Sequence, residues 1–580
     1  MIDLQWLIGG EAGYGIMTTG VTMSKIFTRL GLSVFDYVEY PSLIRGGHNA
    51  YFVRASTEVI HAPKKTVDIL VALNRETIDK HKEELAENAA ILYDSNIIKI
   101  ADGEFGDDKL LIPLPLGDMV KELDVERLMT NTIAMGASLA LFSDDYTILQ
   151  NMMEETFGRK GDDVAEINIK TSKAGFDFVK KHPKRFHIHI EKREQKCLLI
   201  SGAESVSLGS IKAGLKFAAI YPMTPVNMIM TNLTGHALKY GIVLKEPEDE
   251  ISGINMAIGA AYAGVRSMVA TSGGGFALMS EGLGLAAQAE VPLVIVMGMR
   301  PGPATGMPTW SDQGDLQFVL HAAQGDFPRI VLAPGDMREA FSYTMRAFNL
   351  AEKYQLQVII LVDKHLMEGH GTVPMTEMKA DASWFKLERG KFIKDADLAN
   401  EKDYKRYLLT DDGVSPRSLP GQKGGIGLSG SDEHDEHGLY NEEAHVRTAM
   451  MEKRFKKLKT AEKDIFLPDI IGDKDADITL VSFGSTKLSA LDAIEMLRKE
   501  NISANLLNIS FLSPFPSEKV TTLLKRAKKT IVVEANYTGQ FEALIREKTG
   551  ITFSHRYRKY DGRPFFPEDI VEQVKEVLRG

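Results

Sequence analysis

Short apolar runs alternate with longer amphipathic or small-residue segments along most of the chain, most clearly between residues 248 and 315. There the apolar runs 266–271 and 291–297 predict two buried strands. The Ala- and Gly-rich segments 251–264 and 276–289 predict two helices that another element can approach closely. Strands that alternate with helices predict a parallel sheet, and ligands of such sheets bind outside the carboxyl ends of the strands.

The same alternation recurs before and after this stretch, so we predict a multidomain α/β protein built on doubly wound parallel sheets. Between the α/β domains, residues 182–196 read as a charged linker, and residues 377–467 as a charged, partly glycine-rich interdomain segment. The predicted divisions are 1–181, 182–196, 197–376, 377–467 and 468–580.

Composition narrows the functional classes. The chain has 580 residues, of which 44% are hydrophobic, which is enough for several cores. A net charge of −10 argues against nucleic acid or an anionic membrane as the main partner. No apolar run is long enough to span a bilayer, and the N-terminus does not read as a secretory signal, so we expect a cytoplasmic protein. The single cysteine, Cys197, excludes a disulfide framework or a four-cysteine iron–sulfur site built by this chain alone.

Two glycine-rich turns mark the first domain. The run Gly9 to Gly15 follows the first predicted strand but lacks the dinucleotide-binding spacing. It is either a tight turn without a ligand or a phosphate site at the start of a helix. Arg45 stands beside Gly46 and Gly47 in a second polar loop. It either faces a cofactor phosphate or a partner domain, or it caps a helix.

Polar groups also follow the predicted strands of the second domain. Thr224 lies between Pro222 and Pro225, which stiffen the backbone and would present its hydroxyl rigidly at a strand end. A helix N-cap role for Thr224 is compatible with this interpretation. Arg300 follows the strand at 291–297 and opens a polar, Pro- and Gly-rich loop that includes Thr309.

These motifs, taken in order, resemble the α chain of the 2-oxoacid:ferredoxin oxidoreductases, which are thiamine diphosphate enzymes. The first domain resembles the γ chain of the same enzymes, fused in front. The resemblance covers essentially the whole chain and implies a thiamine-enzyme pyrimidine-type domain followed by a transketolase C-terminal-like domain. The motifs that carry it are Tyr221–Pro225, Glu248–Glu250, Thr271–Gly275 and Arg300–Thr309 in the α-like part, and Gly9–Gly15 with Arg45–Gly47 in the γ-like part.

The resemblance implies that this chain is half of an active site. The chain has no G-D-G…N-N run for Mg²⁺ and the thiamine diphosphate tail, and no CxxC for a [4Fe–4S] cluster. Both would belong to a separate β chain, with an (αβ)₂ heterotetramer as the expected assembly. The implied reaction converts a 2-oxo acid, with 2-oxoglutarate favoured, and coenzyme A into acyl-CoA and CO₂ while ferredoxin is reduced. Pyruvate or branched-chain specificity, or a non-catalytic assembly subunit, are the alternatives.

The family also implies roles for individual residues. Glu250 matches the carboxylate that faces N1′ of the aminopyrimidine, although Glu248, Asp249 and Glu250 also fit ordinary acidic residues in a helix first turn. Arg300 would hold the substrate carboxylate, or else fasten its own loop. The remaining candidates are Thr224 and Thr309 for the substrate, and Tyr221, Pro222, Gly273, Gly274 and Arg45 for the cofactor, with a plain loop as the alternative for the glycines.

Two histidine-containing stretches could be mistaken for metal sites. His182, His187 and His189 lack ligand partners at metal spacing, so we interpret 182–196 as a solvated linker. The run 432–437, with the sequence Asp-Glu-His-Asp-Glu-His, is interpreted as an ordered interdomain segment rather than a metal cluster. We therefore predict no metal ligand in this chain.

Overall fold

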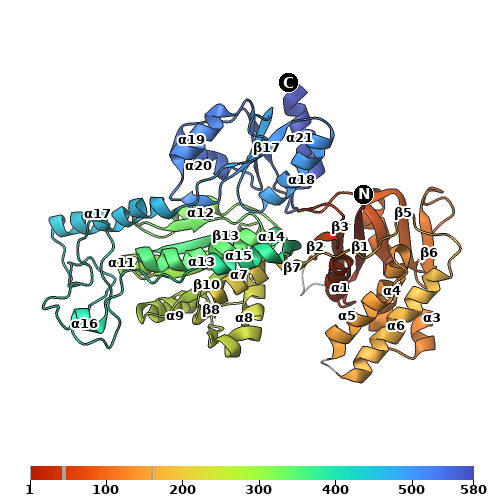
Figure 1. Cartoon of the computed structure of the whole chain (residues 1–580), viewed down its shortest axis with the longest axis horizontal. Helices are drawn as coiled ribbons and strands as arrows, with labels where there is room; N and C mark the ends of the chain where they lie inside the picture. The colour runs from red at the N-terminus through yellow and green to blue at the C-terminus, as the bar shows by residue number, and fades with distance from the viewer. Residues whose placement is uncertain (1, 42–46, 159–160, 580) are drawn as a thin grey trace. The chain divides into compact units, whose positions relative to one another are not determined.

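The computed structural model describes residues 2–41, 47–158 and 161–579. Within these ranges the chain forms two compact units (Figure 1). The first unit comprises Met1–Ile200, Gly369–Met375 and Phe566–Asp569, and the second comprises Ser201–Glu368, Thr376–Phe565 and Ile570–Gly580. Strands alternate with helices in both units, which confirms the α/β class.

The first unit contains an eight-stranded sheet in the order β6-β5-β4-β1-β3-β2-β14-β7. Its strands are β1 (Asp3–Glu11), β2 (Ser33–Glu39), β3 (His48–Ser56), β4 (Val67–Ala72), β5 (Leu85–Asp94), β6 (Leu110–Leu114), β7 (Cys197–Ser201) and β14 (His370–Pro374). Its helices include α1 (Ile16–Arg29), α2 (Arg75–His81), α3 (Leu116–Leu123), α4 (Thr130–Phe142), α5 (Thr147–Phe157) and α6 (Asp162–Lys180).

This sheet is mixed, whereas the sequence predicted a wholly parallel one. Strand β3 runs antiparallel to both β1 and β2, while β1, β4, β5 and β6 are parallel. Only residues 40–47 separate β2 from β3, and so short a connection cannot cross over to a parallel neighbour. His48 and Asn49, expected in a polar loop, begin β3. Arg45 lies outside the described residues.

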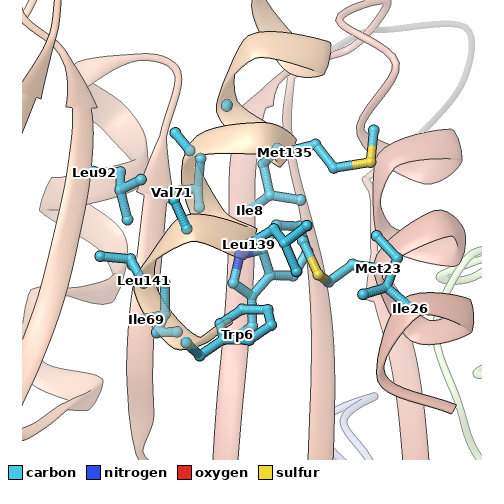
Figure 2. Close-up of a cluster of buried hydrophobic side chains, with 14 of the residues drawn as sticks. Trp6, Ile8, Met23, Ile26, Ile69, Val71, Leu92, Met135, Leu139 and Leu141 are labelled. Atoms are coloured by element: carbon cyan, nitrogen blue, oxygen red, sulfur yellow. The ribbon is translucent and has the colours of Figure 1, made fainter. Parts of the chain in front are cut away.

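The core of the first unit lies between the sheet and helices α1 and α4. Trp6 and Ile8 of β1 pack with Met23 of α1 and Leu139 of α4 (Figure 2), and all four side chains are fully buried. The indole Nε1 of Trp6 donates a hydrogen bond to Ser138 Oγ at 3.1 Å. Residues 182–196 form no helix or strand, but they belong to the first unit, and Phe186 and Ile190 are buried in its core, so this segment is not wholly solvated as the linker interpretation expected.

The second unit is built around a seven-stranded sheet in the order β18-β12-β13-β11-β10-β8-β9. Its strands are β8 (Phe217–Ile220), β9 (Val243–Lys245), β10 (Ser267–Ser272), β11 (Leu293–Met299), β12 (Ile330–Leu332), β13 (Gln357–Asp363) and β18 (Phe511–Ser513). Helices that follow or connect them are α7 (Gly202–Lys212), α8 (Asn227–Tyr240), α9 (Glu250–Tyr262), α10 (Gly273–Leu278), α11 (Ser280–Gln288), α12 (Leu316–His321), α13 (Met337–Tyr354) and α14 (Lys364–Glu368).

Strands β13, β11, β10, β8 and β9 are all parallel, so their carboxyl ends share one edge. From β8 the chain goes to β9 on one side and then returns to β10 on the other. The direction of winding therefore reverses between β8 and β10, where open α/β sheets form a ligand crevice. The strands predicted at 266–271 and 291–297 are confirmed to within two residues. The single helix predicted at 276–289 is two helices, α10 and α11.

The C-terminal part of the second unit has its own five-stranded sheet, in the order β15-β17-β16-β19-β20 (blue in Figure 1). Strand β18 leaves this region and pairs antiparallel with β12 of the larger sheet. The elements are β15 (Ile470–Gly472), β16 (Ile478–Ser482), β17 (Ala504–Asn508), β19 (Thr530–Glu534), β20 (His555–Arg558), α18 (Thr486–Lys499), α19 (Ser517–Arg526), α20 (Gln540–Thr549) and α21 (Pro567–Arg579).

The interdomain segment that precedes this sheet is attached to the end of α11 by buried charged side chains. It contains α15 (Met375–Trp384), α16 (Asp395–Leu398) and α17 (Ala444–Ala461). Glu290 accepts hydrogen bonds from Lys453 Nζ of α17 with both carboxylate oxygens, each at 2.7 Å, and also pairs with Lys457. All three side chains are about 1% exposed, so loss of Glu290 would leave two buried lysines without a counter-charge. Across the described residues, no helix combines the length and the apolar character needed to cross a bilayer.

Candidate functional site

The predicted site residues of the second unit collect at the carboxyl edge of the seven-stranded sheet. Tyr221 and Pro222 follow β8, Gly273 follows β10, and Arg300 follows β11. These three strands are neighbours, and β8 and β10 flank the point where the winding reverses. A ligand at this crevice would therefore meet groups from all three strand ends.

Glu250 and its acidic neighbours have separate roles. Asp249 is the N-cap of α9, and its Oδ1 accepts a hydrogen bond from the Ser252 backbone N–H at 2.7 Å. Glu248 is exposed, whereas Glu250 is only 3% exposed. The Glu250 Oε1 atom accepts a hydrogen bond from Thr271 Oγ at 3.4 Å, so this carboxylate faces β10. Helix initiation explains Asp249 but leaves the burial of Glu250 unexplained.

Gly275 makes room for this carboxylate. A Cβ at position 275 would lie 2.0 Å from Thr271 Oγ and 2.3 Å from Glu250 Oε1, closer than any side chain can tolerate. The glycine run forms the first turn of α10, so the plain-loop alternative is wrong. Gly274 is exposed and open to approach, whereas Gly273 faces Asp315, whose Oδ2 would lie 2.8 Å from an added Cβ.

Arg300 and Thr224 meet across neighbouring strand ends. Arg300 Nη1 donates a hydrogen bond to the backbone oxygen of Thr224 at 3.0 Å, and both residues are half-buried. In the described part of the chain this is the one hydrogen bond of the guanidinium, which leaves donors for a ligand. The N-cap alternative for Thr224 is wrong, because α8 begins at Asn227 with Val226 as its N-cap. Thr309 lies in the loop that Arg300 opens and is 5% exposed.

Two aspartates make the far end of this loop acidic. Burial lowers the pKa of Arg300, and the charges of Asp315 and Glu250 oppose that shift. Burial raises the pKa of Asp315 to about 6, against the effect of Arg300, and raises the pKa of Asp312 to about 7. The Oδ2 atom of Asp315 is buried and has no hydrogen-bond partner in the described ranges. Arg300 thus interacts electrostatically with the carboxylates of Asp315 and Glu250.

Sequence reasoning gave Asp315 no role. An acidic residue just before an apolar helix is normally a helix cap. Asp315 is indeed the N-cap of α12, but its side chain makes no capping hydrogen bond. Its proximity to Arg300 and Gly273 depends on the fold of a long loop and could be anticipated only from its place at the end of that loop.

The run 432–437 has structural partners instead of a metal-like arrangement. His434 is 2% exposed, lies against Tyr407 with ring centroids 4.0 Å apart, and its Nδ1 is 2.9 Å from the backbone oxygen of Asp435. Glu433 pairs with Arg454 at 2.6 Å. Glu436 pairs with Lys405 at 3.0 Å, and His437 with Asp403 at 2.8 Å. These contacts bind the run to other parts of the interdomain segment 377–467.

A hollow of about 640 Å³ lies elsewhere in the same unit, between α13, the end of α15 and residues 463–465. Its charged groups are largely occupied: Lys353 pairs with Asp464 at 2.7 Å, and Asp381 pairs with Arg338 at 2.7 Å. It contains none of the predicted site residues, so its size alone gives no reason to assign it a ligand.

Comparison with known proteins identifies the family. A model described as pyruvate flavodoxin/ferredoxin oxidoreductase, thiamine diphosphate-binding, matches residues 208–453. Models described as pyruvate ferredoxin/flavodoxin oxidoreductase and as pyruvate:ferredoxin oxidoreductase core domain II match residues 5–178 and 476–570. The chain is 33% identical to a 2-oxoacid:ferredoxin oxidoreductase subunit alpha from a Sulfolobus species, over 99% of this chain and 97% of the relative.

The chain belongs to the 2-oxoacid:ferredoxin oxidoreductase family, as an α subunit. It is also 33% identical to the 2-oxoglutarate synthase subunit KorA of Methanothermobacter thermautotrophicus, over 66% of this chain and 98% of that one. A solved 2-oxoglutarate:ferredoxin oxidoreductase from Magnetococcus marinus, with 2-oxoglutarate, coenzyme A and succinyl-CoA bound, superposes with a TM-score of 0.91 at 33% identity. That match covers 99% of each chain.

Membership of this oxidoreductase family makes the chain part of a thiamine-dependent enzyme that acts on 2-oxo acids. It also confirms the predicted fold class, because the thiamine-binding model covers the sheet that carries Glu250 and Arg300. The roles of individual residues in this family member stay predictions.

The raised pKa of Asp312 predicts that the free energy of unfolding changes with pH. Because burial raises the pKa of Asp312, the folded chain is favoured while this carboxyl is protonated and loses stability as the pH rises from about 4 through about 7. Asp312→Asn should therefore stabilise the chain at pH 8 by about 1–3 kcal/mol, allowing for partial exposure, and have little effect near pH 4.

Thermal unfolding of both proteins between pH 4 and pH 8 measures this difference. The control is Asp403→Asn, since this exposed carboxylate has its pKa lowered by a hydrogen bond from His437. It should give no stabilisation that grows with pH. A difference between wild type and Asp312→Asn that stays constant over the range would contradict a buried, titrating Asp312.

Proposed function

We propose that this chain is the α subunit, with a γ-type domain fused in front, of a coenzyme A-acylating 2-oxoacid:ferredoxin oxidoreductase that favours 2-oxoglutarate. The reaction would convert the 2-oxo acid and coenzyme A into acyl-CoA and CO₂, with two electrons passed to ferredoxin. The KorA relatives and the solved Magnetococcus enzyme, which holds 2-oxoglutarate, coenzyme A and succinyl-CoA, support this substrate.

The observation that carries the proposal is the buried carboxylate of Glu250 at a strand edge that also presents Arg300. Among the described residues Glu250 forms no salt bridge, and a carboxylate without one is seldom buried for stability alone. Glu250 is held by Thr271 and enclosed by Gly275, at the point where the winding of the sheet reverses. These residues fit the aminopyrimidine end of thiamine diphosphate, a flat group that needs one carboxylate and an approach free of side chains.

Thiamine diphosphate, when bound, supplies the carbon nucleophile and accepts the charge released when CO₂ leaves. Glu250 would exchange a proton with N1′ of the aminopyrimidine, and the Thr271 hydroxyl would keep its Oε1 directed at that position. Tyr221 and Pro222 after β8 and Gly274 after β10 are exposed at the same edge of the sheet and would border the cofactor.

The substrate would be held by the neighbouring strand end. Arg300 can bind its carboxylate through two parallel N–H···O bonds, which its fork geometry favours. Thr224 and Thr309 would add hydroxyl donors on either side. Because every 2-oxo acid carries this carboxylate, Arg300 would set binding strength but not the choice of substrate.

A β chain would complete the site. Apolar side chains are exposed on the elements that adjoin the crevice, which is unusual for a surface that stays in water. We propose that this surface packs against a β chain that holds Mg²⁺, the diphosphate and a [4Fe–4S] cluster, in an (αβ)₂ heterotetramer from which ferredoxin takes electrons. The exposed side chains are Tyr221, Met228, Leu238, Tyr240, Val243, Ile251, Met256 and Leu278.

Pyruvate is the rival substrate, because the three matching family models are described by pyruvate enzymes. Values of kcat/KM for 2-oxoglutarate, pyruvate and a branched-chain 2-oxo acid, measured on the assembled enzyme, decide between them. A non-catalytic assembly subunit is disfavoured, since selection for assembly alone would not keep Glu250 buried at the crevice.

Glu250→Gln should slow exchange of the thiamine C2 proton by roughly 10²–10⁴-fold. The amide keeps the volume of the side chain but cannot pass a proton to and from N1′. The complex should still assemble and bind thiamine diphosphate through the β chain. Exchange is followed by NMR after transfer to deuterated buffer.

The matched control for this experiment is Glu248→Gln, which changes an exposed carboxylate two residues away. It should leave the exchange rate within about twofold of wild type. Near-normal exchange in Glu250→Gln would remove Glu250 from the mechanism.

Arg300→Ala should lower kcat/KM by roughly 30-fold to several thousand-fold, since losing one partner of a desolvated charge pair costs about 2–5 kcal/mol. Arg300→Lys should recover only part of this, because an ammonium cannot reproduce the two-pronged contact. Steady-state kinetics with pyruvate, 2-oxobutyrate and 2-oxoglutarate should show similar losses for all three, with little change in thermal stability.

Two other outcomes would contradict this role. A loss confined to 2-oxoglutarate would mean that Arg300 reads the second carboxylate of that substrate. A collapse of thermal stability would mean that Arg300 fastens the loop 301–309.

A further inference from the structure

The loop that carries Arg300 is long for a segment without regular structure. It runs from the end of β11 at Met299 to the start of α12 at Leu316. Loops of this length are uncommon in compact domains unless something holds them. Its first half closes on itself, where the Met307 backbone N–H donates to the Pro301 oxygen at 3.0 Å. The second half has a different anchor.

Gln313 provides that anchor. Its side chain is 1% exposed, and each end of the amide has two partners. Its Nε2 donates to the Phe483 oxygen at 3.2 Å and to Asp363 Oδ2 at 3.3 Å. Its Oε1 accepts from Thr486 Oγ at 3.1 Å and from the Ala535 backbone N–H at 3.1 Å. Both donors and both acceptor positions of the amide are thus used, a pattern that an ionised glutamate or an apolar residue of this size cannot match.

The backbone around Gln313 is held in the same way. Its own N–H donates to the Ala535 oxygen at 2.7 Å, and its oxygen accepts from Asn536 Nδ2 at 3.3 Å. The next oxygen along, that of Gly314, accepts from Gln540 Nε2 at 2.5 Å. The backbone of residues 313 and 314 is therefore bound to the C-terminal sheet region by one backbone and two side-chain partners.

Residues just before Gln313 also contact the C-terminal region. The Ser311 backbone N–H donates to the Gly562 oxygen at 3.0 Å. The guanidinium of Arg563 stacks 3.6 Å from the centre of the Trp310 ring. Apart from Asp363, which ends β13, these partners lie in three segments of the C-terminal region, 483–486, 535–540 and 562–563.

The place of this contact within the C-terminal sheet is informative. Strand β16 ends at Ser482 and β19 at Glu534, and the two are parallel neighbours. From β16 the chain goes to β17 on one side, and it later returns to β19 on the other. The winding therefore reverses between β16 and β19, which is the crevice where an open α/β sheet ordinarily binds a small ligand.

We propose that the C-terminal domain binds the Gln313 loop as an internal ligand in this crevice and thereby positions Arg300. Gln313 is the positioning residue: it touches no substrate and acts through the loop that begins at Arg300. Asp363 links the two sheets, because its Oδ2 also accepts from Ser485 Oγ at 2.5 Å and it ends β13, the strand beside β11. The inference rests on the proposed role of Arg300 in holding the substrate carboxylate.

The test is Gln313→Met in the full chain assembled with its β chain. Methionine keeps the size of the side chain and removes all four side-chain hydrogen bonds. We expect KM for the 2-oxo acid to rise so that kcat/KM falls by roughly 10- to 100-fold, with kcat changed less than about threefold. Amide hydrogen exchange of residues 300–312 should become faster.

The matched control is Gln357→Met, which changes another fully buried glutamine in the same unit that makes one long hydrogen bond, of 3.4 Å, to the Val291 oxygen. It should leave KM and exchange in residues 300–312 unchanged. A Gln313→Met enzyme with unchanged KM, or with unchanged exchange in the loop, would overturn the proposal. A fall in kcat alone, in proportion to the folded fraction, would also overturn it.

A double variant separates this inference from the proposed function. If Gln313 acts through Arg300, Gln313→Met should add little loss of kcat/KM on top of Arg300→Ala. Additive losses would contradict the inference while leaving the role of Arg300 intact. If Arg300→Ala alone has no effect, the proposed function fails, whatever Gln313→Met does.

Discussion

The constraint on which the rest of the site depends is the space that a buried carboxylate needs beside a parallel sheet. Glu250, the first residue of α9, faces β10, and helix α10 cannot carry a larger residue at position 275 without meeting its Oε1 atom. This explains the glycine at position 275 although glycine weakens helices.

Two sheets position the groups around this carboxylate. The seven-stranded sheet brings Thr224, Gly274 and Arg300 to one edge through its parallel strand order. The smaller C-terminal sheet presents its own crevice to the loop that begins at Arg300 and fills it with Gln313. The C-terminal region, to which the sequence analysis assigned no site residue, thus supplies most of the hydrogen bonds of the second half of that loop. Polar networks of this kind are costly when half-satisfied and rigid when complete, and this one is complete at Gln313.

The sequence predicted the α/β class, the strands β10 and β11 and the grouping of Glu250, Thr224 and Arg300, because these follow from periodicity and from groups at strand ends. It did not predict β3, since a strand that follows another after a short polar stretch has no helix before it to mark a parallel crossover. It also missed Asp315 and Gln313. Their neighbours in the fold are distant in the sequence. Ala535, for example, is more than two hundred residues from Gln313, and no local pattern encodes such contacts. The capping role considered for Thr224 was wrong because α8 begins three residues later.

The central claim is that this chain is half of an active site, and mixing the two subunits tests it most directly. The purified chain alone, supplied with thiamine diphosphate and Mg²⁺, should oxidise no 2-oxo acid and contain no stoichiometric iron, because the described residues hold no cluster of three or more metal-binding side chains and the sequence has a single cysteine. Addition of the β chain should restore reduction of ferredoxin by the 2-oxo acid and coenzyme A. Oxidation of a 2-oxo acid by this chain without a second polypeptide would contradict the account.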